Sequence, residues 1–196
     1  MAGGKGMEQD YPLQGIRVLE LGSRTITPYI GKLFTDAGAD VLKVESPEGD
    51  PFRTWSASHA TIPDGEDSAW WRFINAGKRI ATIDLETPEG HEAFLELVAE
   101  TDLVLDDHKP EDTERLNITP EELRAHNPAA VIASLTHFGT SGPWANRPAN
   151  DFTLQALVGA TENRGIPGEE PTACGGDLGD FVAAALSAPA VLAVTL

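Results

Sequence analysis

The chain alternates between short apolar runs and segments in which apolar residues recur at helical spacing. Five runs of aliphatic and β-branched residues are predicted to form strands, at residues 16–21, 40–45, 79–85, 102–105 and 130–135. A helical pattern follows the first of these runs, at about residues 28–37. Strands that alternate with helices at this spacing are typical of βαβ units and of a mainly parallel sheet, which predicts an α/β fold.

Two further helix starts share one signature. Thr87-Pro88 and Thr119-Pro120 each place a capping hydroxyl before a proline suited to the first turn, and acidic residues follow. By contrast, residues 46–65 contain several prolines and no clear period, which predicts a long loop. Ligands of parallel sheets bind at the carboxyl ends of the strands. The loops that begin at these ends start at Gly22, Glu45, Asp106 and Thr136.

The length and the charge balance exclude several classes of protein. With 196 residues, the chain amounts to one domain or slightly more. Its 31 acidic and 14 basic residues give a net charge of −17, which argues against a nucleic-acid binder and against docking on an anionic membrane. One small anionic ligand in a local pocket remains compatible with this charge.

The ends and apolar stretches of the chain bear on its location. Residues 1–12 contain no apolar region and are predicted to be a flexible tail before a domain at 13–196. No stretch approaches the roughly 20 apolar residues that span a bilayer. The sequence therefore favours a cytoplasmic protein with neither a membrane nor a nucleic acid as partner.

The cysteine and the histidines do not form a recognisable set of metal ligands. Cys174 is the single cysteine, so an internal disulfide and a cysteine-rich zinc site are excluded. The five histidines are scattered, and no pair has metal-ligand spacing on one helix face, so we expect no metal site. The aromatic cluster of Trp70, Trp71 and Phe73 favours a core or an interface over a stacking platform.

Two glycine-containing loops could carry chemistry. Residues 22–28 lack the G-x-G-x-x-G fingerprint, yet they end at a helix start, where backbone N–H groups can hold a phosphate; an ordinary turn is the alternative. Residues 175–180 precede an alanine-rich helix and contain Asp177 and Asp180. A carboxylate there can attack an activated acyl group, or it can simply cap the helix, which is the commoner role.

Several segments, in order and spacing, resemble the class III CoA-transferases of the CaiB/BaiF type, which include formyl-CoA transferase, carnitine CoA-transferase and α-methylacyl-CoA racemase. The resemblance runs from about Leu13 to the last residue. Its motifs lie at residues 13–21, 37–45, 49–53, 75–79, 83–85, 127–128, 133–139, 141–143 and 155–156. It implies a Rossmann-like parallel sheet with flanking helices, as in the N-terminal half of that family's fold.

The resemblance also implies a reaction. In the family's transferases an aspartate attacks an acyl-CoA thioester, an acyl anhydride and then an aspartyl-CoA thioester form, and CoA passes to a second carboxylic acid. Asp180 preserves the family's Leu-Gly-Asp and is the predicted nucleophile; Asp177 would need a three-residue shift. CoA and acyl-CoA are then substrates, and no tightly bound cofactor is expected.

Carried over by position, the family's CoA contacts fall on residues spread along the chain. They are Thr25, Ile26, Ser46, Ile83, Glu86, Asp107, His108, Arg115 and Phe138. Three positions depart from the family pattern. Ser46 replaces a basic residue, Glu86 stands where some transferases have lysine, and Asp107 stands where asparagine is usual. The last two changes are expected to add negative charge beside a polyanionic ligand.

The resemblance leaves alternatives open. Racemisation is disfavoured, because the racemase histidine would fall on Asn150, whose amide cannot move a proton. Family members are longer, and the chain stops inside the helix that follows Asp180, which indicates a truncated or split member. We therefore expect a homodimer or a complementing C-terminal half as partner. A non-catalytic partner subunit is the alternative function, and the sequence names neither the acyl donor nor the acceptor.

Overall fold

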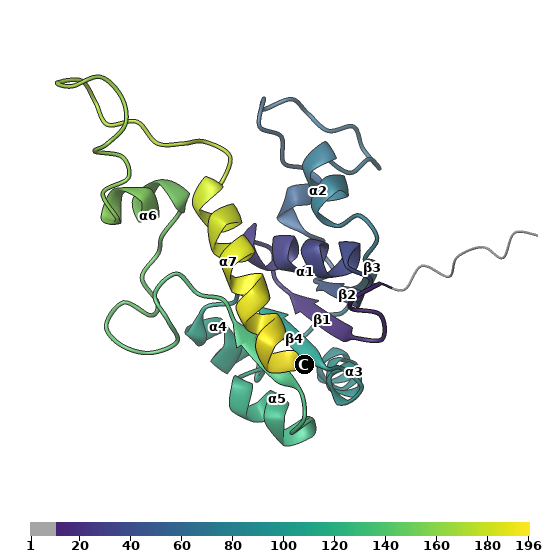
Figure 1. Ribbon diagram of the computed structural model, residues 1–196. Helices are drawn as coiled ribbons and strands as arrows, with labels where there is room; N and C mark the ends of the chain where they lie inside the picture. The colour runs from purple at the N-terminus through teal and green to yellow at the C-terminus, as the bar shows by residue number, and fades with distance from the viewer. Residues whose placement is uncertain (1–10) are drawn as a thin grey trace, which may run out of the picture.

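A computed structural model describes residues 11–196 as a five-stranded sheet with helices on both faces (Figure 1). Most of the predicted tail at 1–12 lies outside these residues. The strands, in the order β3-β2-β1-β4-β5, are β1 Arg17–Leu21, β2 Asp40–Glu45, β3 Arg79–Thr82, β4 Leu103–Asp106 and β5 Val131–Ser134. Every neighbouring pair is parallel. This confirms the predicted α/β fold with a Rossmann-like parallel sheet.

The helices form two layers around the sheet. They are α1 Ile26–Asp36, the 3₁₀ helix η1 Pro51–Arg53, α2 Ala69–Ile74, α3 Pro88–Ala99, α4 Pro110–Arg115, α5 Pro120–His126, α6 Asp151–Leu157 and α7 Leu178–Thr195. One layer contains α1 and α7, which pack against each other, and the other contains α3, α4 and α5 (Figure 1). Both faces of the sheet are thereby covered, as parallel sheets require.

Alternation along the strands divides the core between the two layers. In β1, Val18 contacts the cluster beneath α1 and α7, whereas Leu19 contacts the cluster beneath α3 and α5. Because successive side chains of a strand point to opposite faces, continuous apolar runs fill both cores at once. The strand order reverses between β1 and β4, and ligands of such sheets bind in the crevice at that point.

Some element bounds differ from those predicted. The third strand ends at Thr82 rather than at residue 85, since the chain bends there toward the start of α3, where the hydroxyl of Thr87 accepts a hydrogen bond from the Gly90 amide. The pattern also missed α2, α4 and α6. Each has only six or seven residues, which is too short to display a helical period.

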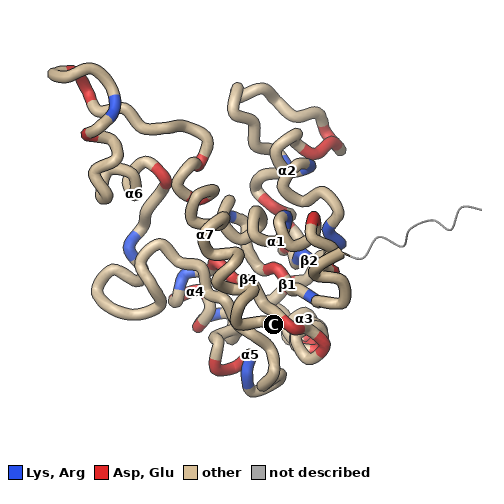
Figure 2. Tube along the Cα trace, in the orientation of Figure 1, with Lys and Arg blue, Asp and Glu red and all other residues tan. Residues whose placement is uncertain are grey.

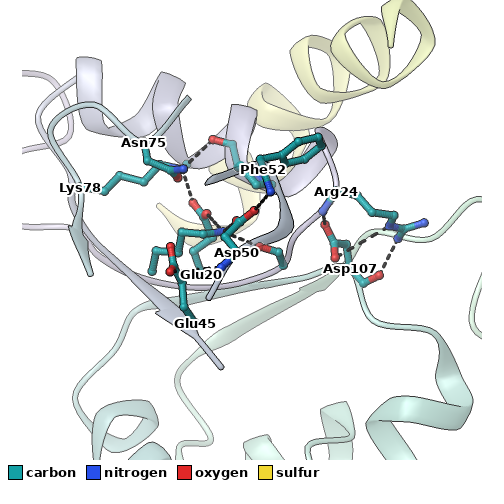
Figure 3. Close-up of polar contacts among 12 residues, drawn as sticks. Glu20, Arg24, Glu45, Asp50, Phe52, Asn75, Lys78 and Asp107 are labelled. Atoms are coloured by element: carbon teal, nitrogen blue, oxygen red, sulfur yellow. Dashed lines mark hydrogen bonds and ion pairs between the residues drawn. The ribbon is translucent and has the colours of Figure 1, made fainter. Parts of the chain in front are cut away.

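A buried cluster of charges fixes the loops after β1 and β2. The ammonium of Lys43 donates a hydrogen bond to the Gly22 carbonyl and lies 3.2 Å from Glu20 Oε1 and 3.0 Å from Asp50 Oδ2. Lys78 Nζ lies 2.7 Å from Glu20 Oε2 (Figure 3). Because Lys43 binds one group from each loop, it holds both at the carboxyl edge of the sheet.

Helix α7 is more apolar than its sequence pattern predicted. It has 18 residues with a mean hydropathy of 1.7, so by length and composition it is long enough to cross a membrane, contrary to our expectation. Core helices of soluble proteins meet the same criterion but are mostly buried, whereas 22% of this helix is buried. Here one face, with Ala184 and Ala188, is buried against the sheet layer, whereas Val182 and Leu186 are exposed.

Candidate active site

The carboxyl edge of the sheet carries a pocket at the ends of β1, β2, β3 and β4. Its volume is about 410 Å³, and Leu21 and Val44 contribute apolar lining. It is also lined by five positions at which the resemblance implies CoA contacts: Ser46, Ile83, Glu86, His108 and Arg115. The fold thus brings these distant residues together, and their contact with CoA stays a prediction.

This pocket is acidic, as its departures from the family pattern suggested. Arg115 donates a hydrogen bond to Glu86, which offsets the charge of that carboxylate. Glu48 and Asp84 also line the pocket, and within residues 11–196 neither has a cation within ion-pair distance. A polyanionic ligand would therefore meet two carboxylates that have no local counter-charge.

His108 also lines this pocket, but it pairs with a carboxylate of its own. Its Nδ1 lies 2.5 Å from Asp106 Oδ1, at the end of β4. Burial lowers the pKa of the His108 imidazole, but the hydrogen bond and charge of Asp106, with smaller contributions from Asp107 and Asp112, raise the pKa above its ordinary 6.5 overall. The His108 ring therefore binds a proton more readily than a free imidazole.

An NMR titration of the His108 ring tests this pairing. We expect a midpoint above pH 6.5, because the folded protein stabilises the imidazolium. Asp106→Asn removes the charge that raises the pKa and should lower the midpoint. Asp112→Asn is the control and should lower it much less. A wild-type midpoint at or below pH 6.5 would contradict the assignment.

The other four predicted contact residues lie outside this pocket. Thr25 is buried, and its Oγ1 donates to Asp177 Oδ2 at 2.9 Å. Ile26 packs against the core beneath α1 and α7. Phe138 lies edge-on to Trp144, with ring centroids 5.4 Å apart. The fourth, Asp107, is buried at the point where the strand order reverses.

Asp107 is held by contacts of its own at this edge, and its contact with CoA stays a prediction. Its carboxylate does not face the 410 Å³ pocket but lies beneath Gly22, where a Cβ atom would approach Asp107 Oδ2 to 2.6 Å. Arg24 Nε lies 3.8 Å from Oδ1, and Nη2 donates to the Asp107 carbonyl at 2.6 Å (Figure 3). Burial raises the pKa of this carboxyl and Arg24 lowers it, with a net increase. Arg24 therefore offsets only part of the cost of burying the Asp107 charge.

Arg24 also connects to the predicted nucleophile. Its Nη1 lies 3.2 Å from His137 Nδ1, and Nη2 donates to the Leu135 carbonyl at 2.8 Å. Arg24 Nη1 also lies 3.3 Å from His137 Nε2, and His137 Nε2 in turn lies 3.8 Å from Asp180 Oδ1. Both side chains are largely buried, with 15% of His137 and 13% of Asp180 exposed. Asp180 thus sits at the carboxyl edge, in the first turn of α7.

Capping of α7 by Asp177 or Asp180 was expected as the commoner role, but neither side chain caps the helix. Asp177 occupies the N-cap position but makes no capping hydrogen bond with its side chain. The capping carboxylate comes from α6, where Asp151 Oδ1 accepts from the Gly179 amide at 2.7 Å. This leaves the Asp180 carboxylate free of the capping role, at the end of the helix where the macrodipole stabilises negative charge.

Helix α6 also holds the loop that leads to Asp180. Gln155 Oε1 accepts from the Cys174 amide, and Nε2 donates to the Cys174 carbonyl, each at 3.0 Å. Gln155 is buried. A side-chain amide that pairs with both backbone groups of one residue fixes that residue, so α6 positions the segment that ends in Asp180.

Arg24, His137 and Gln155 were not predicted as site residues from the sequence, although Gln155 and His137 lie within motifs of the resemblance. Arg24 and His137 do fall in loops that begin at strand ends, at Gly22 and Thr136, and this position was the available signal. Nothing local indicated that the two side chains meet, because 113 positions separate them.

The fold and this edge define a Rossmann-like α/β protein with a carboxylate-containing site at the strand ends. The chain matches the CoA-transferase family III over residues 13–196 and belongs to that family. It is 35% identical to the succinate–glutarate CoA-transferase of Agrobacterium fabrum, over 94% of this chain and 47% of that protein. It is 34% identical to the succinyl-CoA–L-malate CoA-transferase alpha subunit of Chloroflexus aurantiacus, over 96% of this chain and 44% of that subunit.

Solved structures agree with this assignment. A CaiB/BaiF family protein from Brucella suis superposes with a TM-score of 0.88 at 36% identity, over 95% of this chain and 49% of that one. The chain therefore spans about half the length of the relatives it matches. The resemblance found in the sequence is confirmed.

Proposed function

We propose that the chain is part of a CoA-transferase that moves CoA from an acyl-CoA to a carboxylic acid. The observation that carries the proposal is the position of Asp180: a largely buried carboxylate at a helix start, beside His137. A second pocket, of about 150 Å³, is lined by His137 and His108. His108 also lines the 410 Å³ pocket, so it connects that pocket to the edge that carries Asp180. The family membership supports CoA transfer in general.

The proposed reaction uses Asp180 as the nucleophile. Its carboxylate attacks the thioester carbonyl, CoA thiolate leaves, and a mixed acyl anhydride forms. The thiolate then attacks the Asp180 carbonyl and releases the first acid as its carboxylate, which leaves an aspartyl-CoA thioester. An acceptor carboxylate reverses the two steps, so that the second acid leaves as its CoA thioester and Asp180 is regenerated.

The remaining features of the whole protein belong to the same proposal. CoA and acyl-CoA act as substrates, and no cofactor is retained between turnovers. Several relatives are named for succinyl-CoA or succinate as a substrate, and one is an alpha subunit. We propose a second copy or a complementing chain as partner, in the cytoplasm. Apolar side chains exposed on α7, such as Val182 and Leu186, are available to such a partner.

Binding and labelling of the 196-residue chain test the function. Free CoA should bind in calorimetry, and succinyl-CoA should leave a covalent adduct on Asp180 that mass spectrometry detects after trapping with hydroxylamine. A folded chain that binds no CoA and gains no adduct, alone and with a co-expressed complementing half, would contradict the proposal.

The alternative is a non-catalytic partner subunit. The carboxylates of Glu48 and Asp84 in the 410 Å³ pocket favour it, since they oppose a polyanionic ligand. This alternative predicts that an active complex keeps its turnover when Asp180 in this chain is replaced by alanine. Loss of turnover with retained assembly would exclude it.

A further inference from the structure

Three aspartates gather at the start of α7, and one of them differs from the others in its contacts. The acidic positions in the first turns of α6 and α7 lie near each other (Figure 2). Asp151 accepts a hydrogen bond from the Gly179 amide at 2.7 Å, and Asp177 accepts one from the Thr25 hydroxyl at 2.9 Å. Within residues 11–196 the Asp180 carboxylate accepts none, so its orientation depends on another group.

The backbone on both sides of Asp180 is nevertheless held in place. The amide of Gly179, the preceding residue, donates to α6, and the ring of Phe181 lies 4.5 Å from that of Tyr29. Only the two side-chain torsions of Asp180 then remain to be set. Among residues 11–196, the one basic side chain within ion-pair distance of its carboxylate is His137, whose Nε2 lies 3.8 Å from Oδ1. His137 is thus the group that can orient this carboxylate.

Arg24 bears on which ring nitrogen of His137 can donate to Asp180. One Arg24 nitrogen, Nη1, lies 3.2 Å from Nδ1 and 3.3 Å from Nε2 of His137. A guanidinium has donors and no acceptor, so a ring nitrogen that bonds to it must present a lone pair. Since Nε2 is the nitrogen near Asp180, we expect Nδ1 to accept from Arg24 and the hydrogen to lie on Nε2.

Arg24 is itself held by two neighbouring strand ends. Its Nη2 donates to the Asp107 carbonyl at 2.6 Å and to the Leu135 carbonyl at 2.8 Å. These carbonyls follow β4 and β5, whereas Arg24 follows β1. Because the planar guanidinium fork is fixed across three loops, the donor that it presents to His137 is fixed as well.

We propose that His137 donates from Nε2 to Asp180 Oδ1 during the reaction, and that Arg24 is the positioning residue that orients the ring. The separation of 3.8 Å exceeds hydrogen-bond length, so a movement of about 1 Å closes the contact. A neutral donor orients the carboxylate without neutralising it, which leaves Asp180 Oδ2 to attack the thioester. The inference rests on the proposed function, because it assigns the group that assists its nucleophile.

The same His137 N–H acts in the second step of the reaction. Once Asp180 Oδ2 has formed the mixed anhydride, Oδ1 is the carbonyl oxygen of the aspartyl half. Attack of the CoA thiolate on Asp180 Cγ forms the C–S bond and moves the π electron pair onto Oδ1. This pair returns to the Cγ–Oδ1 bond as the Cγ–Oδ2 bond breaks and the first acid leaves as its carboxylate. A hydrogen-bond donor at Oδ1 stabilises the oxyanion between these two events.

The tautomer of His137 tests the inference without requiring activity. In ¹⁵N NMR of the 196-residue chain at neutral pH, we expect Nε2 to have the chemical shift of a protonated ring nitrogen and Nδ1 that of an unprotonated one. Asp180→Asn should move the Nε2 signal, whereas Asp40→Asn, which changes an exposed ion pair between β2 and β3, should not. A proton on Nδ1 alone, a doubly protonated ring, or an Nε2 signal that Asp180→Asn leaves unchanged would contradict the proposal.

Arg24→Met tests the positioning role of Arg24. Without the guanidinium, we expect the His137 proton to distribute over both ring nitrogens, whereas Arg79→Met, at an exposed arginine, should preserve the wild-type spectrum. Arg24→Lys, which keeps the charge but loses the planar fork, gives the same test if Arg24→Met does not fold. A wild-type His137 spectrum in either folded Arg24 variant would exclude Arg24 as the positioning residue.

Kinetic variants separate a donor to Asp180 from a merely structural residue. His137→Ala should lower the rate of aspartyl-CoA formation from succinyl-CoA by about 10²-fold, as expected for loss of one oxyanion donor, with unchanged CoA affinity in calorimetry. His137→Gln places an amide N–H close to the position of Nε2 and should restore most of this rate. His91→Ala is the matched control, because the His91 ring also contacts a backbone carbonyl, that of Asn117, away from the site.

The outcomes distinguish the inference from the function on which it rests. A wild-type rate in His137→Ala, or equal losses in His137→Ala and His137→Gln, would refute the donor while leaving the transferase function intact. Absence of any adduct on Asp180 in the wild-type chain, with and without a complementing half, would refute the transferase function. The ¹⁵N spectrum would still decide the tautomer of His137 and its contact with Asp180.

Discussion

Asp180→Asn is expected to lower the rate of acyl-CoA labelling by at least about 10³-fold, because an amide cannot act as the carboxylate nucleophile. The substitution preserves the shape of the side chain in the first turn of α7. Packing of Phe181, whose ring lies 4.5 Å from that of Tyr29, is unaffected. The loss should therefore appear in the chemical step, with CoA binding retained in calorimetry.

Asp177→Asn is the matched control for that experiment. Asp177 has φ of 53°, a left-handed conformation that asparagine tolerates well. Among residues 11–196 its side chain accepts one hydrogen bond, from Thr25, and an amide oxygen can accept it equally. We expect this variant to label at close to the wild-type rate. The reverse pattern, with labelling lost in Asp177→Asn and kept in Asp180→Asn, would move the nucleophile to Asp177.

The second large effect is expected in stability. Glu20→Gln should lower the free energy of unfolding by about 3–5 kcal/mol, as measured by urea denaturation, because it removes the carboxylate shared by two buried ammonium groups. Lys43 and Lys78 are each at most 1% exposed, and Glu20 is fully buried. Burial already lowers the pKa of Lys78 to about 8, against the attraction of Glu20, so this lysine depends on its partner.

Asp40→Asn provides the control for the buried cluster. Asp40 pairs with Arg79 between β2 and β3, but the two side chains are 49% and 63% exposed. An exposed pair contributes at most about 1 kcal/mol, so this variant should unfold near the wild-type urea midpoint. If Glu20→Gln were as stable as Asp40→Asn, the buried charge cluster would not be what holds these loops in place. The loops after β1 and β2 would then need another anchor.

Much of the fold could be predicted from the sequence because its signals are local. Apolar runs, such as residues 40–45, and threonine caps, such as Thr87, act within a few residues, and five strands with parallel connections follow from them. The resemblance likewise singled out Asp180 through a short motif. Short helices without a threonine–proline start, such as α4, escaped because they are shorter than two helical turns.

The sequence by itself therefore determined the α/β class, the carboxyl edge as the place of the site, and the family. Only the tertiary structure decided that Arg24 pairs with Asp107, that His137 faces Asp180, and that the capping carboxylate of α7 comes from α6. Each of these contacts joins residues at least 28 positions apart. Such pairs depend on which strands are neighbours and which loops meet at the sheet edge. A periodic pattern records only which face of its own element a residue occupies, so it cannot specify them.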